Sequence, residues 1–309
     1  MTVTDIVSTI ASAVMFFTIP VYFLYLLMLY KNRNDENLKY PFYKLMFSVG
    51  IADLLQIINL LLGNTLANSG IFPELYIFLG GLAARISNFG LFGFGMAQNI
   101  GMLFVAFNRY TAYILPMKHL KIWNDRFTRN MIIVQWVVPL IAVSPVIYPF
   151  EFQIQLLADN KTVLLQWKDA KIAAYYQYFC TGAIGGPIFL IVLITYPIIF
   201  ITAIVRTIRS KQPMGKAEKT ALKMSMVGFV ISFGLIIFAG TLYQRLISWN
   251  VFKTFWTDVP TFWMLYNVGN TIYAAANPYA MFIFSGAVRD RFVRMLFGSW
   301  LQEHGAGGA

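Results

Sequence analysis

Residues 45–66 read LMFSVGIADLLQIINLLLGNTL, and Asp53 is the only charged side chain among them. A segment of this length and composition is typical of a helix that crosses a lipid bilayer, because hydrocarbon offers backbone amides no hydrogen-bond partner and a helix satisfies its own. The whole chain shares this character: of its 309 residues, 58% are hydrophobic and only 12% are charged. The sequence therefore predicts an integral membrane protein.

Six further stretches are long and apolar enough to span a bilayer, and Arg109 is the only charged residue within them. Beyond Gly286, Val288 and Phe292 share a helical face that excludes Arg289, which is typical of an amphipathic helix on the inner leaflet. We predict an all-α membrane protein, a seven-transmembrane helix bundle with a short amphipathic helix at its cytoplasmic C-terminus. The expected spans are close to residues 6–30, 45–66, 86–110, 131–148, 172–205, 224–244 and 260–284.

The distribution of basic residues predicts the orientation, because Lys and Arg are retained on the cytoplasmic side during insertion. The first, third and fifth connections and the tail hold all but six of the 24 Lys and Arg residues. We therefore expect a multi-pass plasma-membrane protein with its N-terminus outside and its C-terminus in the cytoplasm. The formal charge of +11 then fits an inner membrane surface, and we expect no nucleic-acid partner. The six residues on the outer side are Arg85, Lys161, Lys168, Lys171, Arg245 and Lys253.

Two features concern the outer loops. Asn160 begins an Asn-Lys-Thr glycosylation sequon in the loop 149–171, on the side that this orientation places outside, although so short a motif also arises by chance. Cys180 is the single cysteine, so no intramolecular disulfide can form and the outer side must be held by helix packing.

Asp53 lies midway along the second span, where insertion scales assign a carboxylate a cost of about 2.5–3.5 kcal/mol. Such a side chain should face the bundle interior. Two interpretations stay open: it binds a sodium ion or a proton, or it orients neighbouring helices through hydrogen bonds. Its expected partners in the third and seventh spans are Gln98, Asn99, Asn270 and Asn277.

Arg109 closes the third span within NRYTAYILPMKH, residues 108–119. A guanidinium at the end of an apolar helix can simply extend to the membrane interface. The residues around it carry more information, since Pro116 and Met117 follow at a fixed distance. The stretch resembles the Asp-Arg-Tyr motif and second inner loop of rhodopsin-like G-protein-coupled receptors, with Asn108 in place of the acid.

Other segments extend this resemblance over nearly the whole chain. Residues 50–55 (GIADLL) are similar to the second-helix motif and residues 277–281 (NPYAM) to the seventh-helix Asn-Pro motif. Residues 41–45 (PFYKL) and 121–123 (KIW) look like nematode serpentine chemoreceptors, closest to classes gamma and V. The chain departs from the wider family in lacking the outer disulfide, a proline in the sixth span, the tyrosine at Met281 and an acid that could pair with Arg109.

The resemblance implies a G-protein-coupled chemosensory receptor formed by residues 1–298, with a short cytoplasmic tail, 299–309. It implies the plasma membrane, and the sensory cilium within it, as the location. A heterotrimeric G protein would be engaged through Asn108, Arg109, Tyr110, Pro116 and Met117. The activation network would consist of Asp53, Gln98, Asn99, Asn270, Asn277 and Pro278.

A small-molecule ligand would bind in the outer half of the bundle. Two arginines near its mouth would favour an anionic ligand, although arginines at interfaces also extend to water or bind lipid headgroups. The candidate pocket residues are Arg85, Leu91, Gly95, Tyr243, Gln244, Arg245, Phe262 and Tyr266.

A secondary transporter or ion channel is the main alternative, because Asp53 and the prolines within spans would suit an ion path. The odd number of spans, the lack of a sequence repeat and the lack of a second intramembrane acid count against it. We expect no enzymatic activity, because neither His119 nor His304 lies within a span. We also expect no metal site and no cofactor beyond a sodium ion at Asp53.

Overall fold

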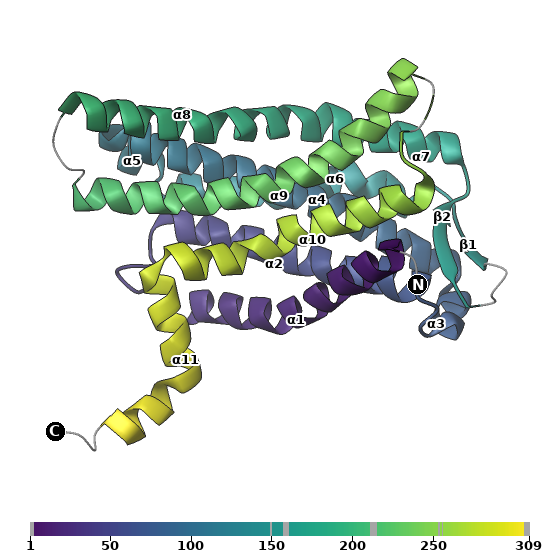
Figure 1. Cartoon of the computed structure of the whole chain (residues 1–309), viewed down its shortest axis with the longest axis horizontal. Coiled ribbons are helices and arrows are strands. Elements are labelled where there is room, and N and C mark those ends of the chain that lie inside the picture. The colour runs from purple at the N-terminus through teal and green to yellow at the C-terminus, as the bar shows by residue number, and fades with distance from the viewer. Residues whose placement is uncertain are drawn as a thin grey trace.

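The computed structural model describes residues 3–148, 150–156, 161–210, 215–252, 254 and 256–305. It is mostly helical, and its long helices run side by side along one axis (Figure 1). Three short helices are α3 (Pro73–Leu79), α5 (Pro116–Ile122) and α7 (Ala170–Gln177). The long helices are α1 (Val3–Lys31), α2 (Pro41–Leu60), α4 (Gly81–Ile114), α6 (Asp125–Ile147), α8 (Gly186–Ser210), α9 (Lys216–Phe252), α10 (Val259–Phe284) and α11 (Gly286–Gly305).

Two π-helical segments extend these helices: η1 (Leu61–Leu66) continues α2, and η2 (Tyr178–Gly185) joins α7 to α8. In the described part of the chain, six helical stretches have the length and composition to cross a membrane, and they match the first six expected spans. Helix α10 occupies the place of the seventh and has 26 residues. A seventh crossing by α10 stays a prediction. The six stretches are Thr9–Lys31, Pro41–Leu66, Gly81–Ile114, Asp125–Ile147, Lys171–Arg206 and Glu218–Arg245.

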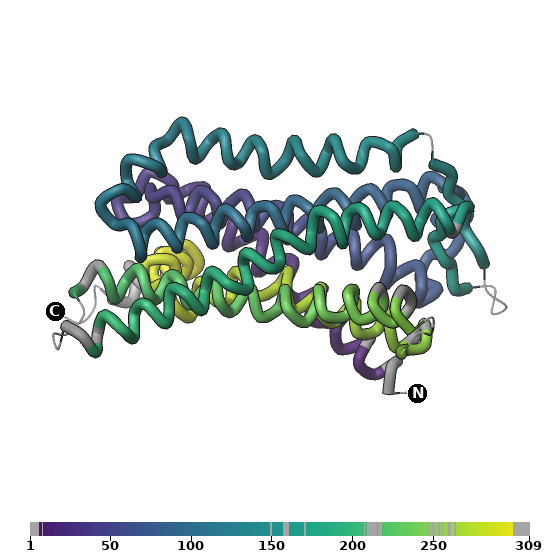
Figure 2. The backbone as a smooth tube through the Cα atoms, turned by 90° about the horizontal axis from the view of Figure 1, so that it is seen from above, coloured from purple at the N-terminus to yellow at the C-terminus, as the bar shows by residue number. Residues whose placement is uncertain are grey.

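Helix α4 is the centre of the bundle, because it packs against α2, α6, α8 and α9. Helix α10 lies between α9 and α1, and α1 also packs on α2, which closes the ring on that side (Figures 1 and 2). Polar side chains on α4 can therefore contact α2, α6, α8 and α9 along the length of the helix.

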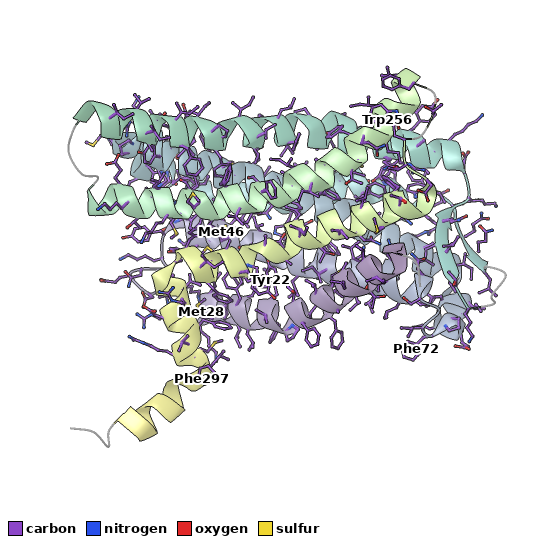
Figure 3. The ribbon with its side chains drawn as sticks, in the orientation of Figure 1. Tyr22, Met28, Met46, Phe72, Trp256 and Phe297 are labelled. Atoms are coloured by element: carbon purple, nitrogen blue, oxygen red, sulfur yellow. The ribbon has the colours of Figure 1, made fainter. Side chains whose placement is uncertain are left out.

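Large apolar side chains occupy both the interior and the outer surface. Tyr22, Met28 and Met46 are fully buried, whereas Phe72 and Phe297 are more than half exposed (Figure 3). On the long helices, outward-facing phenylalanines and isoleucines are exposed along their length. Water would not stabilise such a surface, but hydrocarbon does, which agrees with a multi-pass membrane protein.

Glycines allow α9 and α10 to approach closely. A Cβ atom at Gly234 would lie 2.8 Å from the Cα atom of Tyr273, and one at Gly269 would lie 3.0 Å from the Cα atom of Phe238. Helices in lipid gain much of their association energy from such close packing, because there is little hydrophobic drive between them. These two glycines hold α10 against α9 near the candidate sites.

The two ends of the bundle differ. Strands β1 (Phe152–Leu156) and β2 (Val163–Trp167) pair antiparallel at one end, with Phe152 opposite Trp167. Together with α3 they form what we call the hairpin end, where α1 begins (Figure 1). The opposite end, called the α5 end, carries α5 and α11. Sequence patterns predicted only a loop between the fourth and fifth spans, because a short hairpin on the surface of a membrane protein leaves no strong hydropathy signal.

Helix α11 turns away from the bundle axis at the α5 end (Figure 1). Its first turns pack on the bundle: Val288 is buried, Phe292 contacts Phe282 with ring centroids 4.5 Å apart, and Arg291 forms an ion pair with Asp35. The helix continues past residue 298, where we expected the bundle domain to end. Its expected position on the inner leaflet stays a prediction.

Candidate functional site

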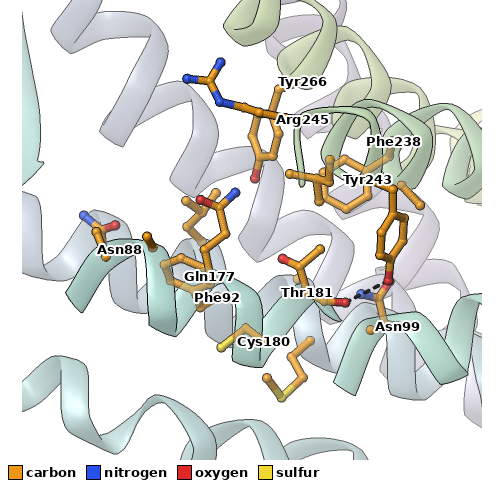
Figure 4. Close-up of a pocket in the computed structure, with 18 of the residues that line it drawn as sticks. Asn88, Phe92, Asn99, Gln177, Cys180, Thr181, Phe238, Tyr243, Arg245 and Tyr266 are labelled. Carbon is orange, nitrogen blue, oxygen red and sulfur yellow. Dashed lines mark hydrogen bonds between the residues drawn. The ribbon is translucent and has the colours of Figure 1, made fainter. Parts of the chain in front are cut away.

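A cavity of about 460 Å³ lies at the hairpin end among α4, η2, α9 and α10, with β2 forming part of its wall (Figure 4). This volume is typical of small-molecule sites, which are mostly apolar with a few convergent polar groups. Six of the eight pocket residues predicted from sequence line it: Leu91, Gly95, Tyr243, Arg245, Phe262 and Tyr266.

The other two predicted residues do not line this cavity. Arg85 donates from Nη2 to the backbone oxygen of Phe150, 3.2 Å away, and so contacts the chain just before β1. The Gln244 side chain accepts a hydrogen bond from Thr257 in the connection between α9 and α10. Arg85 and Gln244 both lie at the hairpin end of the bundle, but hydropathy does not determine which face of a helix is turned inward.

Sequence reasoning missed the part of the wall that comes from β2, α7 and η2, and further residues of α4. This part includes Asn88, Phe92, Trp167, Gln177 and Thr181. Trp167 and Gln177 lie in segments whose arrangement depends on the hairpin. The amide and hydroxyl side chains between Gln153 and Thr181 were the available signal, and they do not distinguish a cavity from a solvated loop.

The π-helical segment η2 shapes the cavity. A π-helix disturbs the regular backbone ladder and is frequent at functional sites. Here the Tyr243 hydroxyl of α9 donates to the backbone oxygen of Thr181 in η2, at 2.9 Å (Figure 4). A Cβ atom at Gly186 would lie 2.8 Å from that hydroxyl, so the glycine leaves room for it. The contact joins α9 to the start of the fifth span across the cavity wall.

The β1–β2 hairpin is attached to the helices without a disulfide. Trp167 donates from Nε1 to Oδ1 of Asn88 on α4, at 2.8 Å. Its ring lies against those of Phe152 and Phe150, with centroids 4.7 and 5.3 Å away, and against Tyr176 at 5.5 Å. An aromatic cluster and a partly buried hydrogen bond therefore hold the segment that borders the cavity.

We predict that Trp167→Ala detaches the hairpin from α4. The substitution removes the bond to Asn88 and the ring contacts, and for a half-buried tryptophan this should cost about 2–3 kcal/mol, less than the 3–5 kcal/mol of a fully buried one. Hydrogen exchange of the β2 amides should then rise by roughly 30- to 150-fold. Trp256→Ala is the matched control, since Trp256 is 56% exposed, and it should leave β2 unchanged. Unaltered exchange in Trp167→Ala would contradict the role of this ring.

Asp53 is buried in the middle of the bundle and accepts hydrogen bonds from three helices. Gln98 of α4 donates from Nε2 to Oδ1 at 2.7 Å, and Asn277 of α10 donates from Nδ2 to Oδ2 at 3.2 Å. Tyr22 of α1 donates its hydroxyl proton to Oδ2. Gln98 and Asn277 were predicted partners. Tyr22 was not, because a tyrosine in a first span is usually placed at the membrane interface.

The other predicted network residues lie close by in sequence but contact different groups. Among the hydrogen bonds of the described residues, neither Asn99 nor Asn270 reaches Asp53. Asn99 lines the cavity and accepts from the Tyr273 hydroxyl at 3.3 Å, and Asn270 is buried on α10. Pro278 follows Asn277 within α10. Tyr22, Gln98 and Asn277 all donate hydrogen bonds to the Asp53 carboxylate. Donors of this kind stabilise the carboxylate as an anion, whereas a sodium ion at Asp53 would need oxygen atoms that face the ion.

Arg109 is buried near the α5 end, with 7% of its surface exposed. Its Nε donates to Oδ1 of Asn108 at 3.1 Å, and Nη2 donates to the same oxygen. The guanidinium carbon lies 4.1 Å from the centre of the Phe42 ring. None of the ion pairs found among the described residues includes Arg109. The arginine is therefore held by an amide oxygen and an aromatic face, where an acid would hold it in the wider family.

Helix α5 packs back on α4 beside this arginine. Thr111 contacts Nδ1 of His119 at 3.0 Å and accepts from Nε1 of Trp123 at 2.8 Å. Burial and the nearby Arg109 charge lower the pKa of His119 to about 4, so its ring stays neutral at physiological pH.

The remaining predicted residues lie in different surroundings. Tyr110 packs partly buried against the core, whereas Pro116 is exposed and Met117 is 88% exposed. Asn160, the predicted glycosylation site, lies outside the described residues.

A multi-pass helical bundle, a small-molecule-sized cavity at one end and a buried arginine of an Asn-Arg-Tyr sequence at the other are the features of the seven-transmembrane receptor class. The family described as serpentine type 7TM GPCR chemoreceptor Srv matches residues 11–298, and the chain belongs to this family. It is 25% identical over 253 residues to a protein of Caenorhabditis elegans named serpentine receptor class V-1, covering 80% of this chain and 79% of that protein. The resemblance to nematode chemoreceptors of class V is thereby confirmed.

Proposed function

We propose that the chain is a chemosensory receptor that binds a small molecule in the cavity at the hairpin end and activates a heterotrimeric G protein at the α5 end. The observation that carries this proposal is the course of α4. The helix lines the cavity with Leu91 and Gly95, bonds Asp53 through Gln98, and carries Arg109 near its C-terminal end. A change in the packing of α4 at the cavity would therefore alter its packing at the α5 end.

The proposed orientation puts the hairpin end outside the cell, with seven crossings of the plasma membrane. The basic connections expected in the cytoplasm join the helices at the α5 end, in agreement with the retention of Lys and Arg on that side. A positive surface there would also attract an acidic partner protein.

The α5 end is closed in this structure by contacts around Tyr113 of α4. The Tyr113 hydroxyl donates to Oε1 of Glu218 on α9 at 3.1 Å, and Nη1 of Arg206 on α8 donates to the Tyr113 backbone oxygen at 3.2 Å. These two bonds join α8 and α9 to α4, one turn beyond Arg109. A G protein would need them to open.

Ligand binding can open this end only if the ligand binds the open packing more tightly than the closed one. The cavity walls include α4, η2 and α9, and the Tyr243–Thr181 bond joins two of them. A ligand that displaces this bond would let α9 shift relative to α8. Such a shift would separate Glu218 from Tyr113 and expose Arg109 to the G protein.

A cell assay tests the proposal. Cells that express the chain with a tag at each end are exposed to odorants and small metabolites, and calcium and cyclic-nucleotide signals are recorded. We expect an N-terminal tag that antibodies reach in intact cells, a C-terminal tag that they do not reach, and a saturable response that disappears when the G protein is inactivated. Two tags on the same side, or a response that persists without any G protein, would disprove the proposal.

A further inference from the structure

We propose that the cavity at the hairpin end binds an aromatic monocarboxylate, with the carboxylate held by Arg245. This inference rests on the proposed function only in taking the cavity as the ligand site. It goes beyond that function by naming the chemical class of the ligand.

The charge of the cavity wall points to an anion. Among the described residues that line the cavity, Arg245 is the only one with a formal charge, and the polar remainder consists of amides, hydroxyls, a thiol and an indole. A cation in a wall without carboxylates attracts anions and repels cations, and the low-dielectric surroundings strengthen both effects. The planar guanidinium also matches a carboxylate with two parallel hydrogen bonds.

The position of Arg245 suits this role. Its guanidinium carbon lies 4.3 Å from the centre of the Phe262 ring, which orients the planar group. Figure 4 shows Arg245 and Tyr266 at one side of the cavity and Cys180 and Thr181 at the other. The second arginine expected at the mouth, Arg85, is engaged with the backbone of Phe150 and does not line the cavity. One arginine, rather than two, implies a monoanion.

The rest of the wall defines the body of the ligand. Aromatic rings come from five elements, α4, β2, α8, α9 and α10, and include Phe92, Phe238 and Tyr266. Rings of this kind stack on aromatic ligands, and they also form cages for quaternary ammonium groups. An ammonium ligand would have to share the cavity with the Arg245 cation and would find no carboxylate among the described lining residues. The wall therefore favours an aromatic acid over an aromatic or aliphatic cation.

Purified receptor in lipid nanodiscs provides the test, with phenylacetate, 3-phenylpropionate, cinnamate and indole-3-acetate as probes and the matched primary amides as neutral partners. We expect at least one acid to bind saturably, about tenfold or more tightly than its amide. Arg245→Gln should weaken binding of that acid by roughly 10- to 100-fold, the range for one charged hydrogen-bonding group, and binding of the amide by less than about threefold. Arg245→Lys should keep part of the preference for the acid.

Arg85→Gln is the matched control, because it removes the same charge at the same end from a side chain that does not line the cavity, and it should leave the ratio of acid to amide affinity unchanged. The inference is overturned if no acid of the panel binds, if acid and amide bind equally, or if a folded Arg245→Gln receptor keeps the preference for the acid. Nucleotide exchange on an added G protein separates the two proposals. An acid that binds through Arg245 in a receptor that activates no G protein would refute the proposed function alone, whereas exchange driven only by neutral or cationic compounds would refute this inference alone.

Discussion

Arg109→Ala is expected to abolish G-protein activation while the receptor still reaches the cell surface. The guanidinium lies between the Asn108 amide oxygen and the Phe42 ring, so its loss removes a few contacts at the end of α4 and leaves the long packing surfaces of that helix intact. In the open packing the same group would face the partner protein, and its replacement by alanine would remove that charge. Nucleotide exchange and surface labelling, measured on the same cells, separate the two effects.

Arg33→Ala is the matched control for this substitution. Arg33 also lies over an aromatic ring, that of Tyr30 at 4.4 Å, but it is exposed in the turn that follows α1. Its replacement should leave signalling within about twofold of the original chain, as expected for an exposed surface change. Asn108→Asp should strengthen the interaction that keeps Arg109 in place, because an ionised acid would pair with the guanidinium. We therefore expect it to lower the basal rate of nucleotide exchange on the G protein. Normal signalling by Arg109→Ala would remove the mechanism.

Asp53→Ala is expected to destabilise the packed bundle by about 3 kcal/mol or more. The carboxylate is in the bilayer before and after the helices pack, so its insertion cost largely cancels, whereas its bonds to Tyr22, Gln98 and Asn277 exist only in the packed state. The substitution leaves three buried donors without an acceptor, and each costs about 1–3 kcal/mol before relaxation. Unfolding of the purified protein in a detergent titration measures the loss.

Two tyrosines one helical turn apart provide a matched pair for the same network. Both Tyr22 and Tyr25 are fully buried on α1, but only the Tyr22 hydroxyl bonds Asp53, while the Tyr25 hydroxyl has no hydrogen-bond partner among the described residues. Tyr22→Phe should cost about 1–2 kcal/mol, and Tyr25→Phe should be neutral or slightly stabilising. Equal losses in the two variants would show that the hydroxyl of Tyr22 contributes nothing specific.

The same measurement distinguishes the two roles of Asp53. Because its neighbours all donate hydrogen bonds, we expect equal stability in sodium and choline chloride at one ionic strength. A stabilisation that is specific to sodium, and that disappears in Asp53→Ala, would instead support an ion site and strengthen the transporter alternative.

Much of the architecture follows from the sequence taken one segment at a time. The bounds of the first six spans agree with the helices to within a few residues at most ends, and Asp53 lies in the interior as its isolation in an apolar stretch required. The family was also recognisable from short motifs around Asp53, Arg109 and Pro278. Each of these inferences depends on local composition, because the bilayer imposes its length and its lack of hydrogen-bond partners on every segment separately.

The tertiary structure alone decided which of these groups meet. Tyr22 reaches Asp53, Asn108 holds Arg109, and Trp167 anchors a hairpin that hydropathy did not predict. It also placed Arg245 in the cavity wall and left Arg85 outside it, bonded to the backbone of Phe150. In lipid both faces of a helix are apolar, so composition determines that a segment spans the membrane but leaves its rotation about its own axis undetermined. That rotation is set by packing against neighbouring helices, and with it the contacts on which recognition and signalling depend.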